Sequence, residues 1–308
     1  MPRTVIEPWP ALPYEDWEPT KQTLHRYAQI VGKIRMALVP FRNHWWHVTL
    51  LPATRGLTTG PMPDGDREME IVFDLLDHRL LITASDGQEQ SLELGHRPAC
   101  ADFYRDVFAA LGAMGVDVDI RPEPYGLGES PSLADDRINN SYDADAVTRF
   151  WRVLVGAEHV LARFASRFNG KASPIHLFWH SFDLAHARYS GRRAPVPDEA
   201  DHVTTEAYSH EVIAFGFWPG DERRTAYPAF YSYTAPEPDG LTSEALDSAQ
   251  AEWQDSGAGS LAVLPYEAVR TTPDPQQTLL SFYESAYRAG ASRAGWDLAG
   301  FATADAPS

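Results

Sequence analysis

Apolar residues recur at helical spacing in four stretches of the chain. The first stretch, residues 20–38, carries an apolar stripe along one face and ends before Pro40. A longer stretch begins after Asp143, a residue type that caps helices, and ends at the Asn169-Gly170 pair. The pattern therefore predicts helices over residues 20–38, 102–112, 143–168 and 276–290.

Between these helices the pattern changes to the alternation and short apolar runs that are typical of strands. Residues 69–74 and 79–83 are joined by a short polar turn, so the stretch 45–94 is predicted to form antiparallel strands. Residues 116–120 alternate cleanly and predict another strand. The second half of the chain is predicted to contain strands at 175–185, 211–218, 229–233 and 260–264.

The order of helix, antiparallel strands and helix occurs twice along the chain. Setting Trp46-His47 against Trp179-His180 also places Arg55 on Arg188, so the pattern Trp-His-x-x-x-Leu-x-x-x-Arg occurs twice. We predict an α+β fold in which two duplicated helix–antiparallel sheet–helix units form one compact body with a composite sheet. The alternative is a chance similarity between two amphipathic segments.

Composition shifts along the chain predict where its segments begin and end. Residues 122–142 are rich in Pro, Gly, Ser and Asp, which is typical of a linker or a long surface loop. The predicted segments are an extended lead-in (1–17), a first α+β half (18–121), the linker loop (122–142), a second α+β half (143–297) and a disordered tail (298–308).

Charge and cysteine content narrow the choice of partners and location. The formal net charge of −17 argues against nucleic acid and anionic membrane surfaces, which attract clustered Lys and Arg. Cys100 is the only cysteine, which excludes an intramolecular disulfide and a cysteine-rich metal site. The N-terminal residues do not resemble a signal peptide, and no apolar run has membrane-spanning length. We expect a cytoplasmic protein.

Metal binding is one interpretation of the histidines in the second half. His176, His210 and Glu211 are of metal-ligand types, and strands that lie side by side could bring them to one divalent ion. His176 and His180 could not share an ion directly, because four residues along a strand span about 13 Å. The alternative is that these histidines are hydrogen-bonded within or beside the core.

Acid–base chemistry is a second interpretation, centred on Asp183 and Glu211. Asp183 lies between Phe182 and Leu184, and a carboxylate in such an apolar run must be paired or have a raised pKa. Arg188 or Arg192 is the natural partner by sequence. The alternative is a buried structural ion pair.

Small-molecule binding is a third interpretation. The aromatic residues Trp46, Trp179 and Trp218 lie in segments predicted to face one another, and Lys171, Arg188 and Arg192 lie close to them in sequence. Aromatic walls with a few convergent charges are typical of a pocket for an anionic or aromatic ligand. The alternative is a Trp-rich core with arginines at its edges.

Many ordered motifs along almost the whole chain resemble a bacterial family of uncharacterised proteins, domain of unknown function 5996. The motifs are Trp9-Pro10-x-Leu12-Pro13-Tyr14, Gln29-Ile30-Val31-Gly32-Lys33-Ile34-Arg35, Asn43-His44-Trp45-Trp46, Arg55-Gly56-Leu57-Thr58-Thr59, Gly170-Lys171-x-Ser173-Pro174-x-His176, Phe182-Asp183-Leu184-Ala185, Ser190-Gly191-Arg192, Tyr208-Ser209-His210-Glu211, Gly216-Phe217-Trp218-Pro219-Gly220, Leu264-Pro265-Tyr266-Glu267 and Trp296-Asp297. The resemblance implies no established activity. The family pattern has a small residue where this chain has His180, which directs attention to His176, Asp183, His210 and Glu211.

Together these observations predict a small-molecule-binding protein whose pocket lies where the two halves meet. Trp46, Trp179 and Trp218 would line the pocket, and Lys171 or Arg188 would hold an anionic group. A metal-dependent enzyme that uses His176, His210 and Glu211 is the alternative, and a structural or interaction module without chemistry is the third hypothesis.

Overall fold

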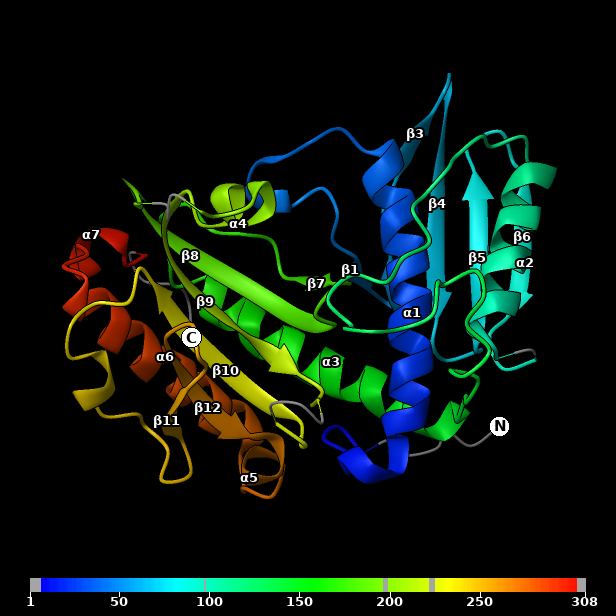
Figure 1. Ribbon diagram of the computed structural model, residues 1–308. Helices are drawn as coiled ribbons and strands as arrows, with labels where there is room; N and C mark the ends of the chain where they lie inside the picture. Colours follow the sequence, from blue (N-terminus) through cyan, green and yellow to red (C-terminus); the bar gives the residue numbers. More distant parts are fainter. Residues whose placement is uncertain (1–6, 97, 196–198, 222–224, 304–308) are drawn as a thin grey trace.

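The computed structural model describes residues 7–96, 98–195, 199–221 and 225–303 (Figure 1). Its four long helices confirm those predicted from apolar spacing, although α1 begins at Tyr14 and continues through Pro19. None of the described helices has the length and apolarity needed to cross a bilayer. The helices are α1 (Tyr14–Leu38), η1 (Asn43–Trp45), α2 (Cys100–Ala113), α3 (Ala144–Ala165), α4 (His202–Ala207), η2 (Leu241–Ser243), α5 (Tyr266–Arg270), α6 (Pro275–Arg293) and α7 (Leu298–Phe301).

The first half of the chain folds its strands into an antiparallel sheet, here called the N-terminal sheet. Its path is β1-β2-β4-β5-β6, and β3 pairs with β4. Tyr27 of α1 stacks on Phe103 of α2 with ring centroids 3.8 Å apart, and Phe103 in turn packs on Phe73 of the sheet. The strands are β1 (Leu51–Ala53), β2 (Gly56–Thr58), β3 (Met62–Asp64), β4 (Arg67–Asp74), β5 (Arg79–Ala84) and β6 (Glu89–Glu93).

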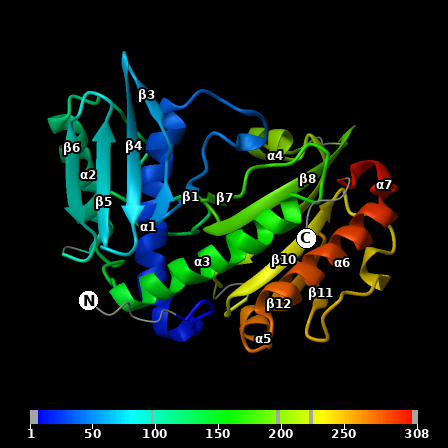
Figure 2. The same ribbon diagram turned by 180° about the vertical axis from the view of Figure 1, so that it is seen from behind.

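The second half forms the C-terminal sheet, in the order β11-β12-β10-β9-β8-β7. Helices α3 and α6 cover one face of this sheet (Figure 2). Aromatic side chains form part of the contact between the helices and the sheet. Phe164 of α3 packs edge-on against Phe215 of β9, with ring centroids 4.6 Å apart. The strands are β7 (His176–Phe178), β8 (Asp183–Arg193), β9 (His210–Trp218), β10 (Ala229–Ala235), β11 (Glu252–Asp255) and β12 (Ser260–Pro265).

Among the described residues, one isolated β-bridge joins the two sheets edge to edge. Leu50 and Leu177 each donate a backbone N–H to the other's carbonyl oxygen, at 2.9 and 2.7 Å. This bridge places the start of β1 beside β7 and continues one sheet into the other. The structure therefore confirms the predicted α+β class, with antiparallel strands throughout the described residues.

Both halves follow the plan of helix, antiparallel sheet and helix. The residues that match when Trp46-His47 is set against Trp179-His180 nevertheless have different surroundings. Arg55 is partly exposed and forms an ion pair with Asp74 at 2.9 Å. Arg188, its predicted counterpart, is 1% exposed. The plan is repeated, and its origin by duplication stays a prediction.

Four segments differ from the sequence-based description. The predicted strand at 175–185 is a hairpin of two strands, β7 and β8, with a turn at residues 179–182. Residues 116–120 bury Val116 and Ile120 but form no strand, because no strand in the described part of the chain shares hydrogen bonds with them. The linker 122–142 packs back on α1, where Arg26 and Asp136 form a buried ion pair at 2.8 Å. The predicted tail contains α7, and residues 304–308 lie outside the described residues.

Candidate functional site

Lys171 and His44 bring the two halves of the chain into contact. The Nζ atom of Lys171 lies 2.6 Å from Nε2 of His44. Lys171 is held beside β8, because Tyr189 donates its backbone N–H to the Lys171 carbonyl oxygen at 2.9 Å. His44 belongs to η1 of the first half. The contact therefore forms only when both halves are folded together.

The backbone around His44 has an unusual conformation. His44 and Trp45 both have positive φ angles, 56° and 61°, which cost energy for residues with a Cβ atom. Helix α4 lies against η1 and holds this turn. The backbone N–H of His44 donates to Oε1 of Glu206 at 2.9 Å, and Nε1–H of Trp45 donates to the carbonyl of Val203 at 3.2 Å. Such strain at a polar cluster is a pointer to function.

The hydrogen-bond partners of His44 define its tautomer. Nδ1 lies 3.3 Å from the carbonyl oxygen of Ala207, which can only accept, so Nδ1 carries the hydrogen. Nε2 of the neutral ring is then an acceptor, and the Lys171 amine donates to it. The imidazole is thus positioned to take a proton from Lys171.

Two aromatic faces complete the surroundings of the lysine. The Nζ atom lies 4.9 Å from the centre of the Tyr189 ring and 5.5 Å from that of Trp46. Tyr189 also stacks on the His44 ring at 4.5 Å. His210 of β9 approaches His44 edge-on at 5.5 Å. We call Lys171, His44, Trp46, Tyr189 and His210 the Lys171 cluster.

Burial and mutual repulsion shift the titration of these groups. Burial lowers the pKa of Lys171, and the Glu206 carboxylate opposes this effect. Burial and then the Lys171 charge lower the pKa values of His44 and His210. Among the described residues, Lys171 makes no ion pair with a carboxylate. The cluster therefore has a half-buried amine whose hydrogen-bond partner is a neutral imidazole.

Of the residues that the sequence suggested, Lys171, Trp46 and His210 come together in this cluster. Trp179 does not join them, because its ring is 4% exposed and packs against α1 at Gly32. Trp218 ends β9 opposite Ala229, whereas His210 begins that strand. The three tryptophans therefore do not line one pocket.

The two predicted arginines have other partners. The Arg188 guanidinium lies on the helix-covered face of the sheet, with Cζ 3.5 Å from the centre of the Phe164 ring, and burial lowers its pKa to about 10. Arg192 forms an ion pair with Glu211 at 2.7 Å, and Trp296 donates to the same carboxylate at 3.0 Å. These contacts place Arg188, Arg192 and Glu211 away from the Lys171 cluster.

Asp183 is paired with hydroxyl groups instead of the expected arginine. Ser181 donates to one of its carboxylate oxygens and Tyr231 donates to the other. Arg188 cannot reach it, because residues 183 and 188 point to opposite faces of the same strand. Asp183 therefore belongs to a separate hydroxyl network on the face of the sheet that α3 and α6 leave uncovered.

The three suggested metal ligands lie far apart. His176 pairs with Ala185 and His210 pairs with Arg193, so about 26 Å of β8 separates the two imidazoles. Glu211 follows His210 and points to the other face. Among the residues that the structure describes, no three His, Cys, Asp or Glu side chains are grouped so that they could hold a metal ion.

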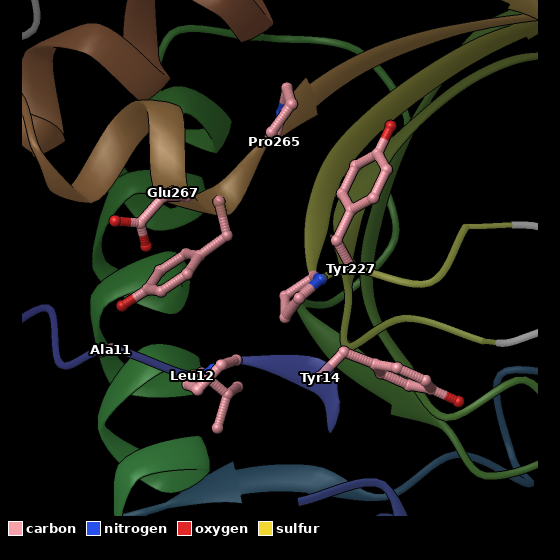
Figure 3. Close-up of a pocket in the computed structure, with 9 residues that line it drawn as sticks. Ala11, Leu12, Tyr14, Tyr227, Pro265 and Glu267 are labelled. Carbon is pink, nitrogen blue, oxygen red and sulfur yellow. The ribbon is translucent and has the colours of Figure 1, made fainter. Parts of the chain in front are cut away.

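A pocket of about 510 Å³ lies elsewhere in the molecule (Figure 3). Apolar and aromatic side chains from the lead-in, the segment before β10 and the β12–α5 junction line it, and Glu267 is its acidic residue. None of the site residues suggested by the sequence lines this pocket. Its lining suits an apolar ligand better than an anion. The lining residues are Ala11, Leu12, Pro13, Tyr14, Tyr227, Pro228, Pro265, Tyr266 and Glu267.

Sequence reasoning did not select His44, Tyr189 or Glu206 as site residues. The only sequence signal for His44 was its place in the Asn-His-Trp-Trp motif. Tyr189 and Glu206 have no distinguishing local pattern, and their role follows from the packing of α4 and β8 around η1.

Comparison with known proteins gives one match. The model of a family described as a family of unknown function, DUF5996, matches residues 9–303, which confirms the resemblance seen in the motifs. No curated protein and no solved structure matches the chain.

Proposed function

The chain belongs to the DUF5996 family of unknown function, and we propose that it binds a small aromatic anion at the Lys171 cluster. The observation that carries this proposal is the contact of a half-buried amine with a neutral imidazole at 2.6 Å, without an ion pair to a carboxylate among the described residues. The Glu206 carboxylate acts on Lys171 without forming an ion pair with it, and removing a cation from water without a counter-charge in contact is costly. A bound anion would supply the missing charge.

The proposed ligand follows from the groups around Lys171. An anionic group would pair with the ammonium, and its negative charge would also favour protonation of His44 and His210. The half-buried Trp46 ring, 5.5 Å from Nζ, offers an aromatic face at the same place. A carboxylate attached to a flat ring would therefore use both features.

The chain as a whole is acidic, so its long-range field does not attract anions. With a net charge of −17, binding must depend on charges close to the ligand. Removal of the Lys171 amine should then abolish anion binding instead of weakening it slightly. We also propose a cytoplasmic location, because the single cysteine allows no intramolecular disulfide.

Thermal unfolding with benzoate, and with benzyl alcohol as its uncharged analogue, tests the proposal. Benzoate at 100 times its Kd should stabilise the protein by about 2.7 kcal/mol. The variant Lys171→Met should lose this effect. Lys33→Met is the matched control, because Lys33 is also buried over a tryptophan ring, 5.8 Å from Trp179, and lies outside the cluster.

The proposal requires benzoate to raise the melting temperature of wild type and Lys33→Met, and benzyl alcohol to raise neither. An equal effect of benzoate on Lys171→Met would contradict it. If inorganic phosphate stabilises the wild type as well as benzoate does, the site binds anions but the aromatic part of the proposal is wrong.

A further inference from the structure

We propose that Lys171 is a nucleophilic amine that condenses with the carbonyl group of an anionic aldehyde or 2-oxo acid. The proposal rests on the proposed function, because the anionic group of such a ligand would be held in the Lys171 cluster. It adds a covalent step and a substrate class to simple binding.

The geometry of the Lys171–His44 pair carries the proposal. An amine attacks a carbonyl only in its neutral form, so it needs a base that removes its proton. The Nε2 lone pair of His44 is 2.6 Å from Nζ, and the hydrogen on Nδ1 is fixed by the Ala207 carbonyl. The base is thus within hydrogen-bond distance of the proton it must take.

The surroundings of the amine favour the neutral form further. Lys171 is half-buried between the rings of Tyr189 and Trp46, and a lysine in such an environment loses solvation of its ammonium form. The lowered pKa of Lys171 agrees with this arrangement. Glu206 makes its hydrogen bond to the backbone N–H of His44, and it helps to hold the turn in place.

Lys33 shows what the His44 contact adds. Burial lowers the pKa of Lys33 too, and its Nζ lies over the Trp179 ring. Within the described parts of the chain, however, Lys33 makes no hydrogen bond to an imidazole. The two lysines therefore share a buried aromatic environment and differ in the presence of a base.

The proposed step is balanced without an oxidant or reductant. His44 takes a proton from the Lys171 ammonium, and the amine lone pair forms a bond to the carbonyl carbon. The attacking nitrogen then loses one proton and the carbonyl oxygen gains one, so the oxygen becomes the hydroxyl of a neutral carbinolamine. His44 returns its proton to this hydroxyl, which leaves as water while nitrogen forms the imine double bond. The nitrogen keeps its last hydrogen, so the product is a protonated imine, and its positive charge pairs with the carboxylate of the ligand.

Reductive trapping with glyoxylate and cyanoborohydride at neutral pH tests the proposal in the full-length protein. Glyoxylate is a small anionic aldehyde, and cyanoborohydride reduces the imine to a stable secondary amine. The chain has only three lysines, Lys21, Lys33 and Lys171, so peptide mapping assigns each modification, and the N-terminal amine lies in its own peptide. Lys171 should be modified at least about ten-fold faster than Lys33.

Two variants separate the roles of charge and base. Lys171→Arg keeps a positive charge but has no amine that forms an imine under these conditions. His44→Asn removes the base, and asparagine tolerates the positive φ of 56° better than most residues. We expect no trapping at position 171 in Lys171→Arg, and His44→Asn to slow trapping at Lys171 about ten-fold or more.

The outcomes distinguish this inference from the proposed function. If Lys171 is modified no faster than Lys33 while benzoate still stabilises the wild type, the covalent step is overturned and the anion site stands. If both trapping and benzoate binding fail, the proposed function fails as well. Trapping that is equally fast in His44→Asn would overturn the role of His44 as the base.

Discussion

The phenolic hydroxyl of Tyr231 on β10 donates a hydrogen bond to the Asp183 carboxylate on β8, across the intervening strand β9. The ring can cross because Gly216 lies beneath it on β9. A Cβ atom at Gly216 would be 2.5 Å from the Tyr231 oxygen and 2.3 Å from the backbone oxygen of Leu184. This contact ties three strands together on the face of the C-terminal sheet opposite α3 and α6.

Removing the Tyr231 hydroxyl should destabilise the protein. We expect Tyr231→Phe to lower the free energy of unfolding by about 1.5–3 kcal/mol, because a hydrogen bond to a buried carboxylate is lost. Urea denaturation measures this change. Tyr208→Phe is the control, since its hydroxyl contacts Tyr233 at an exposed site, and it should change stability by no more than about 0.5 kcal/mol. Equal losses would contradict the assigned role of the Asp183 contact.

Two helical glycines should respond in opposite directions to alanine. A Cβ at Gly32 of α1 would lie 2.1 Å from the Trp179 ring, so Gly32→Ala must move a buried indole and should cost about 1–3 kcal/mol. Gly112 of α2 is exposed and has nothing within 4 Å of the same position. Gly112→Ala should stabilise the protein by about 0.4–1 kcal/mol. Thermal unfolding measures both effects. If the two variants shift the melting temperature in the same direction, the expected contrast is contradicted.

Arg188 should behave as a core residue. Its guanidinium lies among the rings of Phe164, Phe168 and Tyr287 and donates to the Phe164 carbonyl. Arg188→Ala should lower the free energy of unfolding by about 2–5 kcal/mol by leaving a cavity. Arg188→Met, which refills the space without charge, should lose clearly less. Chemical denaturation tests this order, and Arg192→Ala at the exposed ion pair should cost no more than about 1 kcal/mol.

Buried histidines should make stability depend on pH. Burial lowers the pKa to about 3 for His25 and His176 and to about 4 for His186, whereas the unfolded chain titrates near 6.5. Protons therefore bind the unfolded chain preferentially below pH 6.5. The contribution of these histidines to the free energy of unfolding is therefore fully present above pH 6.5. It decreases as the pH falls toward 4, by about 1.4 kcal/mol per pH unit for each histidine.

Urea unfolding between pH 4.5 and 7 measures this dependence. Asparagine at position 176 removes one titrating group, so His176→Asn should reduce the slope by about one proton. His159→Asn is the control, because the His159 side chain is 62% exposed. If His176→Asn and wild type have the same slope, His176 is not held neutral by burial.

The local pattern of the sequence determined most elements of the fold. Apolar spacing predicted the four long helices because each amphipathic face is a property of the helix itself. The alternation at residues 116–120 correctly indicated which side chains are buried. It did not make a strand, because a strand also requires a neighbour that shares its backbone hydrogen bonds, and no local pattern supplies one.

The members of the candidate site were only partly visible in the sequence. Trp46, Lys171 and His210 were selected for their chemistry, but their meeting with His44 depends on α4 lying against η1 and on β8 lying beside residue 171. Alternation along β8 implies that Arg188 and Tyr189 point to opposite faces. Alternation does not say which face of the sheet the helices cover. Because α3 and α6 cover the face that carries Arg188, Arg188 is buried in the core and Tyr189 lies on the other face, beside Lys171. Contacts between residues distant in sequence are decided by packing, so only the tertiary structure assembled the Lys171 cluster.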